Sequence, residues 1–147
     1  MPGIVVGVDG SAHAQRALEW AMREGALRQV EVTVMTVNPA EASPWTGRRL
    51  TMPAEAEAKE QSRQAIEKAV AQAAGEIGAQ QPASVTISVF SGFPARSLID
   101  ASRDADLVVI GSRGAGGFEA LVLGSISSQV VHHAACPVVV VPSDAKR

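Results

Sequence analysis

The stretch GSRGAGGFEALVLGS, residues 111–125, follows directly on the mostly apolar segment Ala105–Ile110 and holds five glycines. A tight connection between a strand and a helix uses one or two glycines, so this stretch holds more than a turn requires. Glycine allows a positive φ and lets main-chain N–H groups face a ligand without an intervening Cβ. Such a row of amides beside a helix N-terminus binds anions, phosphate above all. The stretch therefore predicts a phosphate-binding loop between a buried strand and a helix.

Outward from this stretch, short apolar segments alternate with segments of helical period, a pattern typical of a parallel α/β sheet. We expect strands at residues 3–8, 30–37, 84–90, 106–110 and 137–141. We expect helices from residue 12 to about 26, at 54–77, from 94 to about 103 and at 125–134, with one long loop at Asn38–Pro53. Apolar and polar residues alternate along Ser84–Phe90, which predicts a half-buried strand at a sheet edge.

Composition describes an ordinary globular chain of 147 residues with 46% hydrophobic residues, which predicts a single domain over residues 1–147. The net charge of −2 gives no general attraction to nucleic acid or to anionic membranes. Cys136 is the only cysteine, so the chain has no internal disulfide and no Cys-rich zinc site, and a cytoplasmic location fits best. Since Cys136 precedes a proline in an apolar strand, we expect it to be buried and unreactive.

Two loops at expected strand ends carry unusual chemistry. Gly7-Val8-Asp9-Gly10-Ser11 follows the first strand, and Gly111-Ser112-Arg113-Gly114 follows the fourth. Nine residues later Gly124-Ser125-Ile126-Ser127 opens the next helix, where the two serines add hydroxyl donors. In open α/β sheets, ligands bind beyond the carboxyl ends of strands whose crossovers pass to opposite faces. We therefore expect both loops to face one ligand.

Familiar phosphate motifs are absent from the sequence. A Walker A loop needs Gly-Lys-Ser/Thr, and no lysine lies between Lys68 and Lys146. The dinucleotide fingerprint needs G-x-G-x-x-G after the first strand, and the glycines there have another spacing. A phosphate-accepting receiver domain would need paired acids after the first strand, where Asp9 stands alone.

Three segments resemble the universal stress protein family: IVVGVDGS at 4–11, DLVVIGSRG at 106–114 and ACPVVVVP at 135–142. Nucleotide-binding members of that family carry G-x-x-G, nine residues, then G-[S/T]. Here Gly111–Gly114, Ala115–Leu123 and Gly124-Ser125 match that spacing without a gap. The resemblance covers the whole chain. It implies a Rossmann-like, open, five-stranded parallel sheet of strand order 3-2-1-4-5, with helices on both faces.

The resemblance also implies a function: a small ATP-binding regulatory or sensor module of the stress response, with Mg²⁺ bound through the phosphates. The main chain at Val37 would recognise adenine, and Asp9 would face the ribose or the Mg²⁺. The remaining nucleotide contacts implied are Val8, Ser11, Ile110, Gly111, Ser112, Arg113, Gly114, Gly124, Ser125, Ile126 and Ser127.

Other interpretations of these residues stay open. Asp9 could cap the first helix, and Arg113 could be a solvated loop residue. Arg48 and Arg49, with Trp45, could form a lid over the site or a surface loop. The chain could also be a slow ATP hydrolase or phosphotransferase, a binder of AMP or cyclic AMP, or a scaffold with a vestigial site.

Efficient catalysis is not expected from this set of residues. Phosphoryl transfer generally needs a cationic cradle, a metal ion and a residue that orients the nucleophile. The sequence offers Arg113 and Asp9 for these tasks and no further histidine or carboxylate with a clear role. Any hydrolysis should therefore be slow.

The last expected strand predicts an assembly. Val138–Val141 is apolar on both faces, and the family's strand order places it at a sheet edge. An exposed apolar edge invites uncontrolled pairing and is normally covered. The same strand of a second copy, antiparallel across a two-fold axis, is the simplest cover. We therefore expect a homodimer through Pro137–Pro142.

Overall fold

The computed structural model describes residues 3–9, 12–39, 52–112 and 124–142. Within these ranges strands and helices alternate, as the sequence predicts. Their bounds are β1 (Ile4–Gly7), α1 (Ala12–Arg28), β2 (Glu31–Pro39), α2 (Met52–Ile77), β3 (Ser84–Gly92), α3 (Pro94–Ala101), β4 (Leu107–Gly111), α4 (Ser125–His133) and β5 (Val138–Val141).

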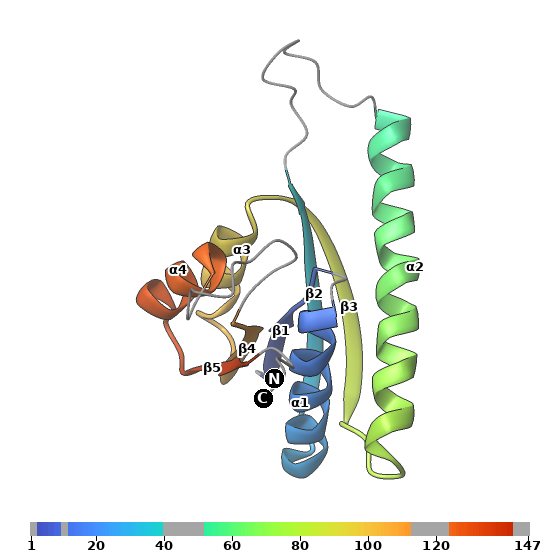
Figure 1. Ribbon diagram of the computed structural model, residues 1–147, viewed down its shortest axis with the longest axis vertical. Helices are drawn as coiled ribbons and strands as arrows, with labels where there is room; N and C mark the ends of the chain where they lie inside the picture. The colour runs from blue at the N-terminus through green and yellow to red at the C-terminus, as the bar shows by residue number, and fades with distance from the viewer. Residues whose placement is uncertain (1–2, 10–11, 40–51, 113–123, 143–147) are drawn as a thin grey trace.

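The five strands form one parallel sheet of order β3-β2-β1-β4-β5, which confirms the expected fold class. In Figure 1, α2 stands alongside the long β3, while α3 and α4 lie on the other side of the sheet. Helix α1 packs against α2, and α3 packs against α4, so each face carries one pair of helices. The sheet is thus covered from both sides.

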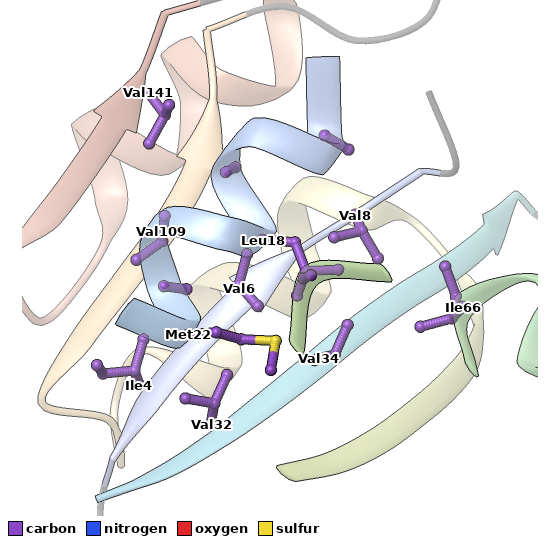
Figure 2. Packing of buried hydrophobic residues seen from close by; sticks show 14 of the residues in the cluster. Ile4, Val6, Val8, Leu18, Met22, Val32, Val34, Ile66, Val109 and Val141 are labelled. Carbon is purple, nitrogen blue, oxygen red and sulfur yellow. The ribbon is translucent and has the colours of Figure 1, made fainter. Parts of the chain in front are cut away.

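Two hydrophobic clusters fill the space between the sheet and its helices. One joins α1 and α2 to the sheet and includes Val32 and Val34 of β2, with the side chains shown in Figure 2. The other joins α3 and α4 to the opposite face and includes Val5 and Met35. Within residues 32–37 of β2, even-numbered residues therefore face α1 and α2, and odd-numbered residues face α3 and α4.

Two glycines allow helices to approach the sheet closely. A Cβ on Gly25 of α1 would overlap the Val32 side chain of β2. A Cβ on Gly7, at the end of β1, would lie 2.9 Å from Cδ1 of Leu98 in α3. Helix α3 is therefore packed directly against the carboxyl end of β1, close to the expected site.

The expected loop Asn38–Pro53 is too long at both ends. Strand β2 continues to Pro39, because β3 extends to Gly92 and pairs with it residue by residue. Helix α2 begins at Met52 and takes Pro53 into its first turn, where a missing N–H breaks no helical hydrogen bond. The expectation that β3 is an edge strand is confirmed by the strand order.

Candidate functional site

The point at which crossovers reverse lies between β1 and β4. These strands are neighbours in the sheet, with Ile4 paired with Leu107. The chain leaves β1 for α1 on one face and leaves β4 for α4 on the other. In open α/β sheets this arrangement leaves a ligand crevice beyond the carboxyl ends of the two strands. Both glycine-containing loops start at this point.

Ser112 joins three elements at the end of β4. Its N–H donates to the carbonyl of Val141 at 3.0 Å, and its own carbonyl accepts from the N–H of Gly124 at 2.7 Å. The start of α4, at Gly124, is therefore held against Ser112, the residue at which the chain leaves β4. Arg113 and Gly114, together with 115–123, lie between these two points and outside the described residues.

The N-terminus of α4 presents main-chain donors. Gly124 is its N-cap and makes no side-chain cap hydrogen bond. The first bond within the helix runs from the Ser128 N–H to the Gly124 carbonyl at 2.9 Å. The N–H groups of Ser125, Ile126 and Ser127 therefore have no acceptor within the helix, and the first turn carries no acidic residue. This end of the helix is positive, and its free N–H groups suit an anion.

Ser125 and Ser127 differ in what their side chains can do. Ser125 is exposed, whereas Ser127 is buried. The Ser127 hydroxyl donates to the carbonyl of Gly111 at 2.5 Å and so ties α4 to the end of β4. The hydroxyl proton of Ser127 is thus used in a hydrogen bond within the chain. The sequence analysis instead expects this hydroxyl to donate to a phosphate. Ser127 is better placed to position the loop than to bind the anion through its side chain.

Val37 lies where β2 extends past the end of β1. The Val8 N–H donates to the Met35 carbonyl at 2.9 Å, and the register between β1 and β2 ends with Gly7 opposite Met35. Residues two apart in a strand present their N–H and C=O to the same side. Val37 therefore directs one donor and one acceptor past the end of β1, into the crevice.

The other expected site residues fall into three groups. The side chains of Val8 and Ile110 are buried in the two core clusters, so that only their main chains can reach a ligand. Asp9 and Ile126 are exposed at the carboxyl end of the sheet. Ser11 lies outside the described residues.

Thr36 lies at this end of the sheet, and no motif in the sequence indicates it. Its side chain is 6% exposed and follows Val32 and Val34 on the face of β2 that packs against α1 and α2. One signal in the sequence could have indicated Thr36: it places a hydroxyl at the position where the core residues Val32 and Val34 predict another apolar side chain.

Two observations on the described residues concern metal ligands and the single thiol. No group of three or more His, Cys, Asp or Glu side chains there could hold a metal ion. Cys136 is half-buried and lies just before β5 rather than inside it, since β5 begins at Val138. Burial raises the pKa of its thiol.

None of the described helices is long and apolar enough to cross a membrane.

The model of the universal stress protein family matches residues 2–142. The chain belongs to this family. A universal stress protein of Mycolicibacterium smegmatis is 38% identical over 143 residues, which are 97% of this chain and 48% of the relative. The chain thus spans about half the length of the curated relatives it matches.

Solved structures of the family share the fold. UspA from Lactobacillus plantarum is 25% identical, with a TM-score of 0.75 over 95% of this chain and 97% of that one. A universal stress protein from Archaeoglobus fulgidus, solved in complex with dAMP, is also 25% identical. Its TM-score is 0.58 over 95% of this chain and 96% of that one. The family and the strand order expected from the sequence are thereby confirmed.

Proposed function

We propose that this chain is an adenine-nucleotide-binding module with a regulatory role. The observation that carries the proposal is the hydrogen bond between Ser112 and Gly124, which holds the end of β4 against the open N-terminus of α4. An anion bound there would receive the main-chain N–H groups of Ser125 and its two neighbours. The A. fulgidus relative in complex with dAMP supports an adenine nucleotide as the ligand.

The base would lie at Val37, on the far side of β1 from the phosphates. Its N–H and C=O form a donor–acceptor pair that complements N1 and the N6 amino group of adenine. Strands β2 and β4 flank β1, so they are two inter-strand spacings, or about 10 Å, apart. A nucleotide laid across the end of β1 would reach both positions.

We propose ATP with Mg²⁺ as the natural ligand, with AMP and cyclic AMP as the alternatives. Asp9 is exposed beyond the end of β1, where a carboxylate beside a triphosphate requires a cation or sugar hydroxyls between them. If Asp9 acts through Mg²⁺, Asp9→Asn should weaken Mg-ATP binding more than binding of metal-free ATP. Equal losses with and without Mg²⁺ would assign Asp9 to the ribose.

Calorimetric titration with ATP, AMP, cyclic AMP and GTP, each with and without Mg²⁺, tests the proposal. We expect saturable binding of at least one adenine nucleotide and weaker binding of GTP, whose O6 is an acceptor where adenine carries a donor. The absence of binding by all adenine nucleotides would contradict the proposed function.

We propose that any ATP hydrolysis is slow. Efficient phosphoryl transfer needs a cation on the transferred phosphate and a residue that orients the nucleophile. Steady-state phosphate release should therefore fall well below typical enzyme rates of about 1–10³ s⁻¹. A rate within that range that Asp9→Asn abolishes would make the chain an enzyme.

We also propose a homodimer through β5, because the two edges of the sheet differ. At the β3 edge, Arg63 of α2 reaches the Ile87 carbonyl at 3.4 Å, and a charged side chain on an edge discourages pairing. At the β5 edge, the bonds to β4 use the carbonyls of Pro137 and Val141. By alternation, Val138 and Val140 direct their N–H and C=O away from the sheet. Their side chains are only half-buried.

Pairing of two β5 strands has a preferred register. Pro142 has no N–H, and its carbonyl accepts from Arg16 Nη1 at 3.0 Å, so this residue is a poor pairing partner. The antiparallel register with Val139 on the two-fold axis instead pairs Val138 with the partner's Val140. Sedimentation equilibrium should report a dimer that Val139→Lys dissociates, while Thr86→Lys on β3 leaves it intact. A wild-type chain that stays monomeric at high micromolar concentration would contradict the dimer.

A further inference from the structure

Three polar side chains are buried in the described part of the chain: Thr36, Ser102 and Ser127. The hydroxyls of Ser102 and Ser127 both donate to main-chain carbonyl groups, at 2.6 and 2.5 Å. The Thr36 hydroxyl makes no hydrogen bond in the structure of residues 3–9, 12–39, 52–112 and 124–142. The Thr36 hydroxyl thus differs from the other two, because it is not committed to a partner among the described residues.

Thr36 occupies the last core position before the crevice. It follows Val34 on the same face of β2 and immediately precedes Val37, whose main chain faces the crevice. The end of β1 runs beside it, because the Val8 N–H bonds to Met35. Figure 2 shows Val34 and Val8 in the core cluster at this end of the sheet.

The hydroxyl oxygen of Thr36 is the part of the residue that reaches the surface. Among the described residues, every fully buried side-chain nitrogen or oxygen has a hydrogen-bond partner. The unpartnered oxygen of Thr36 must therefore retain part of the residue's 6% exposure. Toward the amino end of β2 the face is closed by Val34, which is 0% exposed. Thr36 is the last residue on this face of β2 whose side chain the structure describes, and it directly precedes Val37.

We infer that the Thr36 hydroxyl is a specificity-determining contact for the adenosine half of the bound nucleotide. This inference rests on the proposed function. A hydroxyl supplies one donor and two acceptor lone pairs, which suits a group on the base or the ribose. The proposed phosphate position, at the N-terminus of α4, lies beyond β1 and β4 from Thr36. The contact is therefore shared by AMP and ATP, whatever the number of phosphates.

Thr36→Val tests this role because valine keeps the shape of the side chain and removes only the hydroxyl. We expect the affinity for AMP and for ATP to fall by the same factor, about fivefold to tenfold, as for one lost hydrogen bond. The melting temperature of the ligand-free protein should not fall, because no hydrogen bond within the chain is lost. Thr36→Ser should restore binding to within about twofold, since it keeps the hydroxyl.

Thr33→Val is the matched control, because Thr33 lies on the opposite face of the same strand, nearer its amino end. This variant should bind AMP and ATP as the wild type does. Wild-type affinity in Thr36→Val would contradict the inference while leaving the proposed function intact. A loss confined to ATP, or a lowered melting temperature, would also contradict it. A wild-type protein that binds no adenine nucleotide would contradict both.

Discussion

The two ends of the sheet differ in whether their polar groups form hydrogen bonds within the chain. At the amino end, side chains close the connections between helices and strands. Gln81 Nε2 donates to the carbonyls of Ala74 and Gly78 at 3.1 and 2.6 Å, and Gln29 Nε2 donates to the main chain of Gln81 at 2.9 Å. At the carboxyl end, the N–H groups at the start of α4 have no acceptor within the helix, and the Thr36 hydroxyl makes no hydrogen bond among the described residues.

We interpret this difference as a separation of stability, at the amino end, from the proposed function, at the carboxyl end. Ser125 and Ile126 are exposed and Thr36 retains 6% exposure, so the polar groups at the carboxyl end are accessible to a ligand. The amino end stabilises the connections, and under the proposed function the carboxyl end receives the ligand. Changes at the carboxyl end should therefore affect binding, and changes at the amino end should affect unfolding.

Among the substitutions that compare the two ends, Ser125→Glu should cause the largest change in nucleotide affinity. A carboxylate in the first turn of α4 would repel a bound phosphate and lower nucleotide affinity by about tenfold or more. The same charge favours the positive end of a helix by about 0.3–1 kcal/mol, so the melting temperature should hold or rise. Calorimetric titration and thermal unfolding measure the two effects.

Gln129→Glu is the control for Ser125→Glu, because it adds the same charge one turn further along α4 at an exposed position. This control should change affinity by less than about twofold, since the dipole and the phosphate act within the first turn. Equal affinities of Ser125→Glu and the wild type would remove the N-terminus of α4 from the site.

Gln81→Ala should show the opposite behaviour at the amino end. Loss of two hydrogen bonds to main-chain carbonyls should lower the free energy of unfolding by about 1–2 kcal/mol and leave nucleotide affinity unchanged. Gln72→Ala, at an exposed position of α2, should change stability by less than about 0.5 kcal/mol. Weaker nucleotide binding by Gln81→Ala would break the separation between the two ends.

The alkylation rate of Cys136 should show the smallest of the expected effects. It precedes β5 at the amino end, and burial raises the pKa of its thiol, so that less thiolate is present at pH 7–8 than in an unfolded chain. Mass spectrometry should find slower alkylation by iodoacetamide in the native than in the denatured protein, with no change on adding nucleotide. Alkylation of the native protein at the denatured rate would show that the thiol is not protected.

Much of the fold follows from the sequence, because apolar runs and helical periods mark elements that pack on both sides of a sheet. The alternation in Ser84–Phe90 identifies an edge strand correctly. The carboxyl end of β2 and the start of α2 are missed. Strand β2 continues past β1 because β3 pairs with it as far as Gly92. That pairing depends on contacts far apart in the sequence.

The candidate site stays a prediction, to which the structure adds contacts that the sequence does not indicate. Glycine spacing indicates which loops meet at the crevice, but it cannot show that the Ser127 hydroxyl bonds to Gly111. Thr36 escapes notice because threonine is common in strands, and only its burial without a partner marks it. The roles of Asp9, Val37 and Ser125 toward a nucleotide stay predictions.

Mapping of main-chain amide signals by NMR during titration with AMP tests most directly the claim that the carboxyl end receives the ligand. The amides of Val37, Ser125, Ile126 and Ser127 should shift in a saturable manner. The amides of Gln81 and Ala83, at the amino end, should stay in place. Saturable shifts confined to the amino end, or no shifts at millimolar AMP and ATP, would contradict the account.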